Sequence, residues 1–229
     1  MMLARIYDAA QSNFNKAYIG KRDDVLSLLP YTAKRVLDIG CSVGTLGAAI
    51  KKTLGAHMTG VELSKKMANV ASSKLDRVLC GKIEDIFERN LLEDCSFDVI
   101  IFSDVLEHLE NPWGILKKSL KYLTSDGTII ASIPNVRHID TIYNLILKGY
   151  WPYRERGIHD HTHLRFFTKR NIFELFDAAG LTITKLEVTY RIFEWTGKYR
   201  KLSNLIRYMP CNDFFAFQYL IVANITTKG

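Results

Sequence analysis

The sequence predicts a protein of the α/β class, with helices packed around one mostly parallel sheet. From Arg35 onward, short β-rich runs alternate with helical stretches at intervals of about 20 to 30 residues, which is the rhythm of βαβ units. A glycine-rich turn joins the first predicted strand to the helix that follows it. The last strand comes after a break in this alternation, and mixed sheets often accept one antiparallel strand at an edge. We therefore expect seven strands, the last of them inserted late and antiparallel.

The segment before Arg35 has the spacing of helices. Apolar residues recur at helical spacing from Leu3 to Tyr18, and a second apolar stretch ends at Pro30. We expect two helices within residues 1–30. The strands are then expected, in order, at 35–40, 58–63, 77–81, 97–103, 127–134, 182–190 and 217–225. Residues 191–216 are expected to form an insertion, partly helical, before the last strand.

The composition is that of an ordinary folded domain. The chain has 229 residues, of which 48% are hydrophobic and 24% charged, and these shares exclude a disordered chain and a disulfide-dense scaffold. Its four cysteines form no C-x-x-C pair, which excludes the usual zinc-ligand and redox spacings. No apolar run approaches the ~20 residues of a membrane span, and the N-terminus lacks the apolar core of a secretory signal. We expect a cytoplasmic protein.

The glycine-rich turn lies in RVLDIGCSVGTLG, a strand that ends at Asp38 and turns through Gly40 and Gly44 into a helix. Such a turn brings bare backbone N–H groups up to a ligand at the carboxyl edge of the sheet. A dinucleotide fingerprint would need glycine at the position of Ser42. Asp38 would repel a pyrophosphate but attract an ammonium group, by ~1 to 4 kcal/mol at about 4 Å. The turn therefore favours S-adenosylmethionine as the cofactor.

Two further strand ends carry acidic residues. Glu62 ends the second predicted strand, where a carboxylate accepts hydrogen bonds from ribose hydroxyls. Glu84 and Asp85 follow the third strand, in a position to face an adenine amino group. Taken singly, Asp38 fits a helix N-cap and Glu62 a solvated strand end. The cofactor prediction therefore depends on their combination with the glycines.

Three features together resemble the class I S-adenosylmethionine-dependent methyltransferases: VLDIGCSVGTLG, the Glu62 strand end, and FDVIIFSDVLEHLENPWGILKKSLKYLTSDGTIIASIPN. The resemblance runs from about Arg35 to the C-terminus. It implies a Rossmann-like three-layer sandwich with strand order 3-2-1-4-5-7-6 and strand 7 antiparallel. It also implies one methyltransferase domain over residues 1–229 that uses S-adenosyl-L-methionine and releases S-adenosyl-L-homocysteine.

The resemblance carries a set of cofactor contacts over to this chain. They are Asp38, Gly40, Cys41, Gly44, Glu62, Leu63, Ile83, Glu84, Asp85, Ser103, Asp104 and His108. The chain departs from the family at Ser42, often a glycine, and at Lys82, often an acidic residue of the adenine loop. A relative that kept the fold as a non-catalytic binding module stays open as an alternative.

The segment after the fifth predicted strand, 135–165, has the composition of an acceptor-binding lid. Five of the six histidines lie between positions 108 and 163. The lid also holds Arg137, Arg154, Arg156 and Arg165 and the aromatic residues Tyr150, Trp151 and Tyr153. A hydroxyl acceptor has to lose its proton, and histidine is the commonest general base. We predict His159, His161 and His163 as catalytic candidates, His163 with a structural hydrogen bond as its alternative role.

The stretch HTHLRFFTKRNIFELFDAAGL resembles ubiquinone-biosynthesis O-methyltransferases and enzymes associated with cell-surface polysaccharide synthesis. Much of it predicts structure: Thr168 caps a helix, and Gly180 ends it. The core-facing residues of this helix are expected to be Ile172, Leu175, Phe176 and Ala179.

A second constellation is Asp104, Glu107 and His108, which at this spacing share one helical face. With a later histidine such as His161 they would suit a divalent cation. A similar metal arrangement occurs in plant small-RNA 2′-O-methyltransferases and in members of the ubiquinone group. Metal-free family members also carry an EHL-like segment, so we predict no resident metal.

The predicted activity is O-methylation of a small-molecule or glycan-type acceptor, with an acidic acceptor favoured by the arginines of the lid. The net charge of +7 keeps an RNA methyltransferase as an alternative. Against RNA stand the lack of an appended RNA-binding motif and of an N-P-P-Y-type tetrapeptide. The basic, aromatic stretch 191–210 fits a membrane-surface helix, a dimer face or a solvated flank, and we favour the flank.

Overall fold

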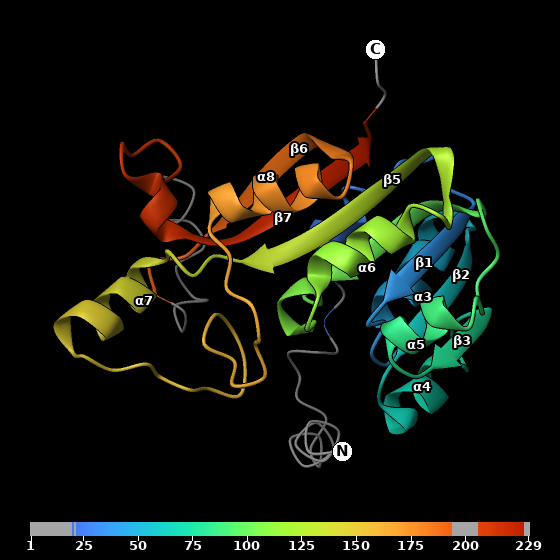
Figure 1. Cartoon of the computed structure of the whole chain (residues 1–229), viewed down its shortest axis with the longest axis horizontal. Helices are drawn as coiled ribbons and strands as arrows, with labels where there is room; N and C mark the ends of the chain where they lie inside the picture. The colour runs from blue at the N-terminus through green and yellow to red at the C-terminus, as the bar shows by residue number, and fades with distance from the viewer. Residues whose placement is uncertain (1–19, 21, 194–205, 227–229) are drawn as a thin grey trace.

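The computed structural model describes residues 20, 22–193 and 206–226, and seven of its strands form one sheet in the order β3-β2-β1-β4-β5-β7-β6 (Figure 1). The strands are β1 (Arg35–Ile39), β2 (His57–Glu62), β3 (Arg77–Cys80), β4 (Phe97–Ser103), β5 (Leu123–Pro134), β6 (Leu181–Tyr190) and β7 (Ala216–Ile225). Strands β1 to β5 pair in parallel, whereas β7 runs antiparallel to both β5 and β6. The predicted strand order and the antiparallel insertion of the last strand are confirmed.

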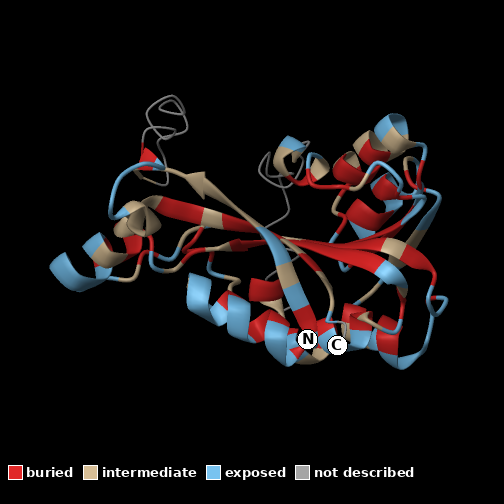
Figure 2. Cartoon of the chain, turned by 90° about the horizontal axis from the view of Figure 1, so that it is seen from above, coloured by how far each residue is buried: buried red, intermediate tan, exposed pale blue. Residues whose placement is uncertain are grey.

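Helices cover both faces of the sheet and make three layers. The helices are α2 (Asp23–Leu26), α3 (Thr45–Leu54), α4 (Lys65–Ala71), α5 (Ile83–Glu88), α6 (Pro112–Ser119), α7 (Ile139–Ile142) and α8 (Lys169–Ala178). One apolar core joins α2, α3 and α4 to one face of the sheet, and a second joins α5, α6 and α8 to the other. Figure 2 shows strands that are buried along most of their length beneath helices with exposed outer faces.

The two cores follow from the alternation of side chains along the strands. In β4, Ile100 and Phe102 belong to the core beneath α5, α6 and α8, whereas Val99 and Ile101 belong to the core beneath α3. Both faces of a parallel strand are thus apolar, as expected for a sheet covered by helices on each side.

Helix ends were predictable where capping residues mark them. The Thr168 side chain accepts a hydrogen bond from the Asn171 N–H in a capping box at the start of α8. Gly180, just beyond the end of α8, has a φ of 82°. Ile172, Leu175 and Phe176 are fully buried. The predicted helix and its core face are confirmed.

Several predictions fall on residues outside the described ranges. The first of the two helices predicted in residues 1–30 falls there, and so does most of the helical stretch predicted in the 191–216 insertion. Of the second apolar stretch, the structure forms only the short α2 and a turn that ends at Pro30. The predicted lid contains α7, a single π-helical turn η3 (Tyr143–Leu147) and a loop that leads to α8. Among the described residues, the helices are all too short or too polar to cross a bilayer.

Candidate active site

The predicted cofactor residues stand at one edge of the sheet, where β1, β2, β3 and β4 all end. Parallel pairing aligns Asp38 with Gly60 of β2 and with Ile101 of β4. Glu62 and Ser103 are the last residues of β2 and β4. The strand ends therefore bring together side chains that are widely separated in the sequence, at the edge where open α/β folds bind ligands.

The turn after β1 depends on left-handed backbone at three positions. Gly40 and Gly44 have φ values of 77° and 74°, and Ser42 has a φ of 51°. A Cβ atom at Gly40 would lie 2.6 Å from a methyl carbon of Val105, so this position accepts glycine alone. Ser42 occupies a conformation that glycine adopts without strain, which explains why the family often has glycine there.

Asp38 is a buried carboxylate, 2% exposed, that accepts no hydrogen bond from the described residues. Burial, and then the nearby charge of Glu62, raise the pKa of Asp38 to about 7, although Arg22 opposes the shift. A carboxylate that is buried without a partner is poised to receive a cation. The ammonium group of S-adenosylmethionine meets that need, so this side chain fits the cofactor.

Glu62 is held by the backbone around it. Its Oε2 accepts the Ser42 N–H at 2.9 Å, and its Oε1 accepts the Ser64 N–H at 2.8 Å. Burial raises the pKa of Glu62, and the hydrogen bonds from Ser64 and Ser42 offset part of that rise. Each carboxylate oxygen has a second lone pair, so the oriented group still has capacity for two ribose hydroxyls.

The remaining predicted cofactor residues near this edge differ in exposure. Leu63 is 39% exposed beside Glu62, and Ile83 is buried at the start of α5. Glu84 is half-buried and Asp85 exposed in the first turn of α5. Cys41 is buried, and its N–H donates to the Val61 carbonyl, so Cys41 supports the turn.

Asp104 lies in a polar network that the sequence did not reveal. Its Oδ2 accepts from the guanidinium of Arg22, and its Oδ1 accepts from the side chains of Gln218 and Ser132. Arg22 also donates to the Ser103 hydroxyl at 2.7 Å. Burial opposes the charge of Arg22, but Asp104 and Asp24 together hold its pKa above the usual value. Arg22 and Gln218 come from a loop and from the last strand, so only tertiary structure places them here.

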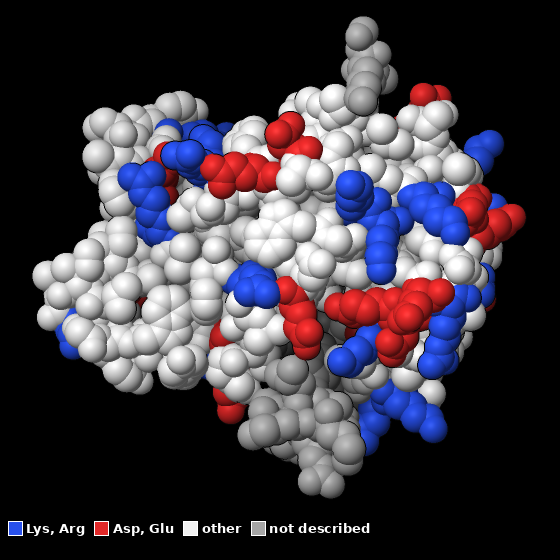
Figure 3. Space-filling view, in the orientation of Figure 1, with Lys and Arg blue, Asp and Glu red and all other residues white. Residues whose placement is uncertain are grey.

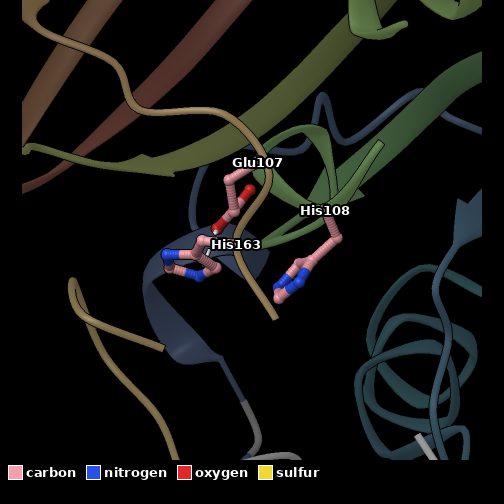
Figure 4. Close-up of side chains that lie close together, drawn as sticks. All are labelled: Glu107, His108 and His163. Atoms are coloured by element: carbon pink, nitrogen blue, oxygen red, sulfur yellow. Dashed lines mark ion pairs between the residues drawn. The ribbon is translucent and has the colours of Figure 1, made fainter. Parts of the chain in front are cut away.

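Glu107, His108 and His163 converge beside this network (Figure 4). Each contributes one potential ligand atom, and these atoms all lie within 4.8 Å of one another. Glu107 is 1% exposed, and its fully buried Oε2 has no hydrogen-bond partner among the described residues. Burial, and then the charge of Asp104, raise the pKa of Glu107 well above its ordinary value.

The two histidines of this group both present a ring nitrogen to Glu107 or to the space beside it. His108 Nδ1 lies 3.3 Å from the Thr162 carbonyl, and His163 Nδ1 lies 3.1 Å from the Ile158 carbonyl. A carbonyl oxygen only accepts, so each Nδ1 carries the proton and each Nε2 keeps its lone pair. Burial lowers the pKa of both rings, that of His163 to about 4, which keeps them neutral. Neutral imidazole beside a buried carboxylate suits a divalent cation.

The structure places the three lid histidines in different surroundings. His159 is completely buried, with Nε2 3.0 Å from the Thr141 hydroxyl, a setting that favours a structural role over the predicted catalytic one. His161 bonds through Nδ1 to the Arg154 carbonyl. His163, and not His161, joins Glu107 and His108. Asp104 stays outside that group because its left-handed backbone precedes the short 3-10 turn η2 (Leu106–His108).

Two of the four lid arginines form bonds within the protein. Arg154 pairs with the buried Asp140 at 2.9 Å, and Arg165 donates to the Glu110 carbonyl. Figure 3 shows a mostly uncharged surface around α7, with charges crowded over the opposite half of the same face. The exposed residues here include Leu145, Ile146, Leu147, Tyr150 and Tyr153. The lid surface is therefore more apolar than its arginine count implies.

Comparison with known proteins places these features in a family. A family profile described as a methyltransferase domain matches residues 13–186. A ubiquinone biosynthesis O-methyltransferase from Paraburkholderia phymatum is 30% identical over 165 residues, covering 69% of this chain and 69% of the relative. One of the same name from Idiomarina loihiensis is 30% identical over 158 residues, covering 65% of this chain and 61% of the relative. A solved S-adenosylmethionine-dependent methyltransferase from Archaeoglobus fulgidus matches with a TM-score of 0.64 at 20% identity, over 89% of this chain and 94% of that one.

Proposed function

The chain belongs to the methyltransferase-domain family as an S-adenosylmethionine-dependent enzyme, and we propose that it methylates a hydroxyl oxygen of a small-molecule or glycan-type acceptor. Relatives named O-methyltransferases support the choice of oxygen. The observation that carries the proposal is the convergence of Glu107, His108 and His163 beside the cofactor edge, because a hydroxyl must be deprotonated to accept a methyl group.

The cofactor has a charge pattern that the strand ends match. Asp38 would receive the ammonium group, and Arg22, which acts on Asp38 through its charge, would face the cofactor's carboxylate. Glu62 would accept the two ribose hydroxyls with the lone pairs that its backbone partners leave free. When bound, the cofactor supplies an electrophilic methyl group. The protein's task is to hold the acceptor oxygen in line with it.

On the acceptor side, His108 and His163 would act through Nε2 lone pairs beside the Glu107 carboxylate. These three side chains fit a divalent cation, which would lower the pKa of a bound hydroxyl. The orphaned Glu107 oxygen favours such an ion more strongly than the sequence pattern does. Thr162 fixes the His108 ring by accepting from Nδ1 while its own hydroxyl donates to Asp160 at 2.6 Å.

The test is incubation of the protein with methyl-labelled cofactor and separate pools of sugar nucleotides, quinone precursors and RNA. We expect label in a small-molecule or sugar pool, with the methyl group on oxygen by mass spectrometry. Label in RNA alone would replace this proposal with RNA methylation. Failure to bind S-adenosylhomocysteine in a calorimetric titration would instead favour a non-catalytic binding module.

The cation is tested separately, by inductively coupled plasma analysis of protein purified without chelators. We expect a stoichiometric divalent ion in the wild type and its loss in Glu107→Gln. His161→Ala is the matched control, because His161 lies in the same loop but outside the group. Absence of any stoichiometric ion would leave His163 as a direct base and remove the cation from the proposal.

A further inference from the structure

Arg191, just beyond β6, is a half-buried arginine whose charge is not compensated by the described residues. Its Cζ lies 3.9 Å from the centroid of the Phe217 ring. Its backbone is fixed at both ends, because the N–H donates to the Phe215 carbonyl and the carbonyl lies 2.8 Å from His138 Nε2. The guanidinium forms no hydrogen bond or ion pair within the described chain. Its position is therefore set by packing, and the described residues leave its donors available.

The charges around Arg191 do not balance. Those that act on it are Asp104, Arg156, Arg22 and Asp24. The two carboxylates are already used, since Arg22 forms ion pairs with both. Arg156, exposed in the lid, has no ion-pair partner among the described residues. Two guanidinium groups without an ion-pair partner among the described residues, those of Arg191 and Arg156, thus act on each other.

The two half-buried arginines near Asp104, Arg22 and Arg191, differ in the way this imbalance predicts. The pKa of Arg22 is raised by its paired carboxylates in spite of burial. The pKa of Arg191 is lowered, first by burial, while Asp104 only partly offsets burial and the charges of Arg156 and Arg22. Clustered like charges are unfavourable unless an anion neutralises them. Nothing else in the described chain provides that anion.

We infer that Arg191, assisted by Arg156, forms an anion subsite that binds an oxyanion group, phosphate or carboxylate, carried by the methyl acceptor. Stacking on Phe217 covers one face of the guanidinium and leaves its in-plane N–H groups free for a forked contact with two oxygens. The charge of Asp104 acts on both Arg191 and Glu107, so an acceptor held at Arg191 can direct a hydroxyl toward Glu107 and His163. The role of the bound anion as part of a methyl acceptor rests on the proposed function. The binding of an anion at Arg191 does not.

The test is a titration of three probes, phenyl phosphate, benzoate and neutral benzyl alcohol, into the full chain saturated with S-adenosylhomocysteine. Ligand-detected magnetic resonance gives the dissociation constants. We expect both anions, or one of them, to bind at least about tenfold more tightly than benzyl alcohol, since hydrogen bonds between charged groups contribute at this level. Which anion binds more tightly identifies the acidic group. Equal binding of the neutral probe would overturn the inference.

Variants locate the subsite. Arg191→Gln should weaken anion binding about tenfold or more, and Arg191→Lys by a few-fold, because lysine keeps the charge but not the fork. Arg156→Gln should have a smaller effect, because that side chain is exposed. Arg35→Gln is the matched control: Arg35 also lies over a phenylalanine, Phe97, but at the amino end of β1. Unchanged anion binding in both Arg191 variants would overturn the inference.

Failure of this inference and failure of the proposed function give different results. If the wild type does not bind S-adenosylhomocysteine, the methyltransferase function is contradicted. The anion probes can then be titrated into the chain alone, and their binding still tests the subsite. Normal S-adenosylhomocysteine binding with no preference for anions would contradict the subsite alone. Arg191→Lys retains a cation of similar length, so it provides a folded variant if Arg191→Gln does not fold.

Discussion

The cofactor edge and the acceptor side of this active site hold their functional groups by different means. Asp38 and Glu62 stand at strand ends, where backbone pairing fixes their positions and burial leaves their charges poorly satisfied. His108 and His163 come from separate loops, and side-chain bonds to the carbonyls of Thr162 and Ile158 orient them. The first region depends on regular secondary structure, and the second on contacts between irregular segments.

This difference predicts that cofactor binding and methyl transfer can be changed separately. Changes on the acceptor side should alter the rate of methyl transfer and leave cofactor affinity intact. Changes at the cofactor edge should alter affinity and, because its carboxylates are buried at a cost, also stability. Each prediction below concerns one region and names the property that should change.

The largest effect is expected for His163→Ala and Glu107→Gln. General acid–base catalysis is worth about 100-fold to 10,000-fold, so the rate constant should fall within that range. The dissociation constant of S-adenosylhomocysteine should change less than about twofold. Initial-rate kinetics and calorimetry check the two quantities, and His161→Ala is the control. A comparable loss of cofactor binding would show that the two regions are not separate.

The next effect concerns Asp38→Asn, which should act in opposite directions on binding and stability. Removing the carboxylate should weaken S-adenosylhomocysteine binding about 100-fold, from the lost attraction to its ammonium group. The same change removes a buried, repelled charge, so the free energy of unfolding at pH 8 should rise by about 2 kcal/mol. Urea unfolding and calorimetry measure both. A destabilised variant would mean that Asp38 has a structural partner.

His159 tests whether the lid histidines have structural roles. His159→Ala removes a buried ring bonded to Thr141 and packed against Trp151, so it should lower the free energy of unfolding by about 2 kcal/mol. Methyl transfer at saturating substrate should stay within a few-fold of the wild type. A loss of turnover without a loss of stability would restore His159 as a catalytic residue.

The pH dependence of cofactor affinity follows from Asp38. Its pKa in the folded protein is about 7, above its ordinary value of 3.8, so the folded protein binds this proton more tightly than the unfolded chain does. The contribution of this proton to the free energy of unfolding is present at low pH and is lost as the pH rises from about 4 to about 7. The ammonium group of the cofactor needs the ionised form, so S-adenosylhomocysteine affinity should fall about tenfold per pH unit below 7. Asp38→Asn should abolish that slope.

The smallest effect is expected at Ser42, in the left-handed position of the turn after β1. Ser42→Gly should raise the free energy of unfolding by about 1 kcal/mol, because glycine accepts a φ of 51° without strain. The backbone N–H that holds Glu62 is retained, so cofactor affinity should stay within about twofold. Thermal unfolding with and without S-adenosylhomocysteine checks both values, and a weakened affinity would give the Ser42 hydroxyl a direct role.

The sequence predicts the cofactor edge better than the acceptor side for a physical reason. Strand periodicity, the glycine turn and the acidic strand ends are local signals, and parallel pairing then aligns the strand ends automatically. The network around Asp104 could not be predicted from local signals, because its partners Arg22 and Gln218 come from a loop before β1 and from the last strand. No local pattern marks either of them.

The lid shows that residue composition alone does not predict which side chains face the site. Histidine content alone favoured His159 and His161, but burial places His159 in the lid interior. The sequence suits His163 equally to a structural and a catalytic role, and its approach to Glu107 and His108 supports the catalytic proposal. Arg191 is the first residue of the stretch 191–210 that we favour as a solvated flank, and its stacking on Phe217 depends on pairing between β6 and β7.

The separation of binding from chemistry is tested most directly by calorimetric titration of S-adenosylhomocysteine into Asp38→Asn and His163→Ala side by side with the wild type at pH 8. We predict that Asp38→Asn binds about 100-fold more weakly and that His163→Ala binds as the wild type does. Wild-type affinity in Asp38→Asn, or an equal loss in both variants, would contradict the assignment of cofactor binding to the strand ends.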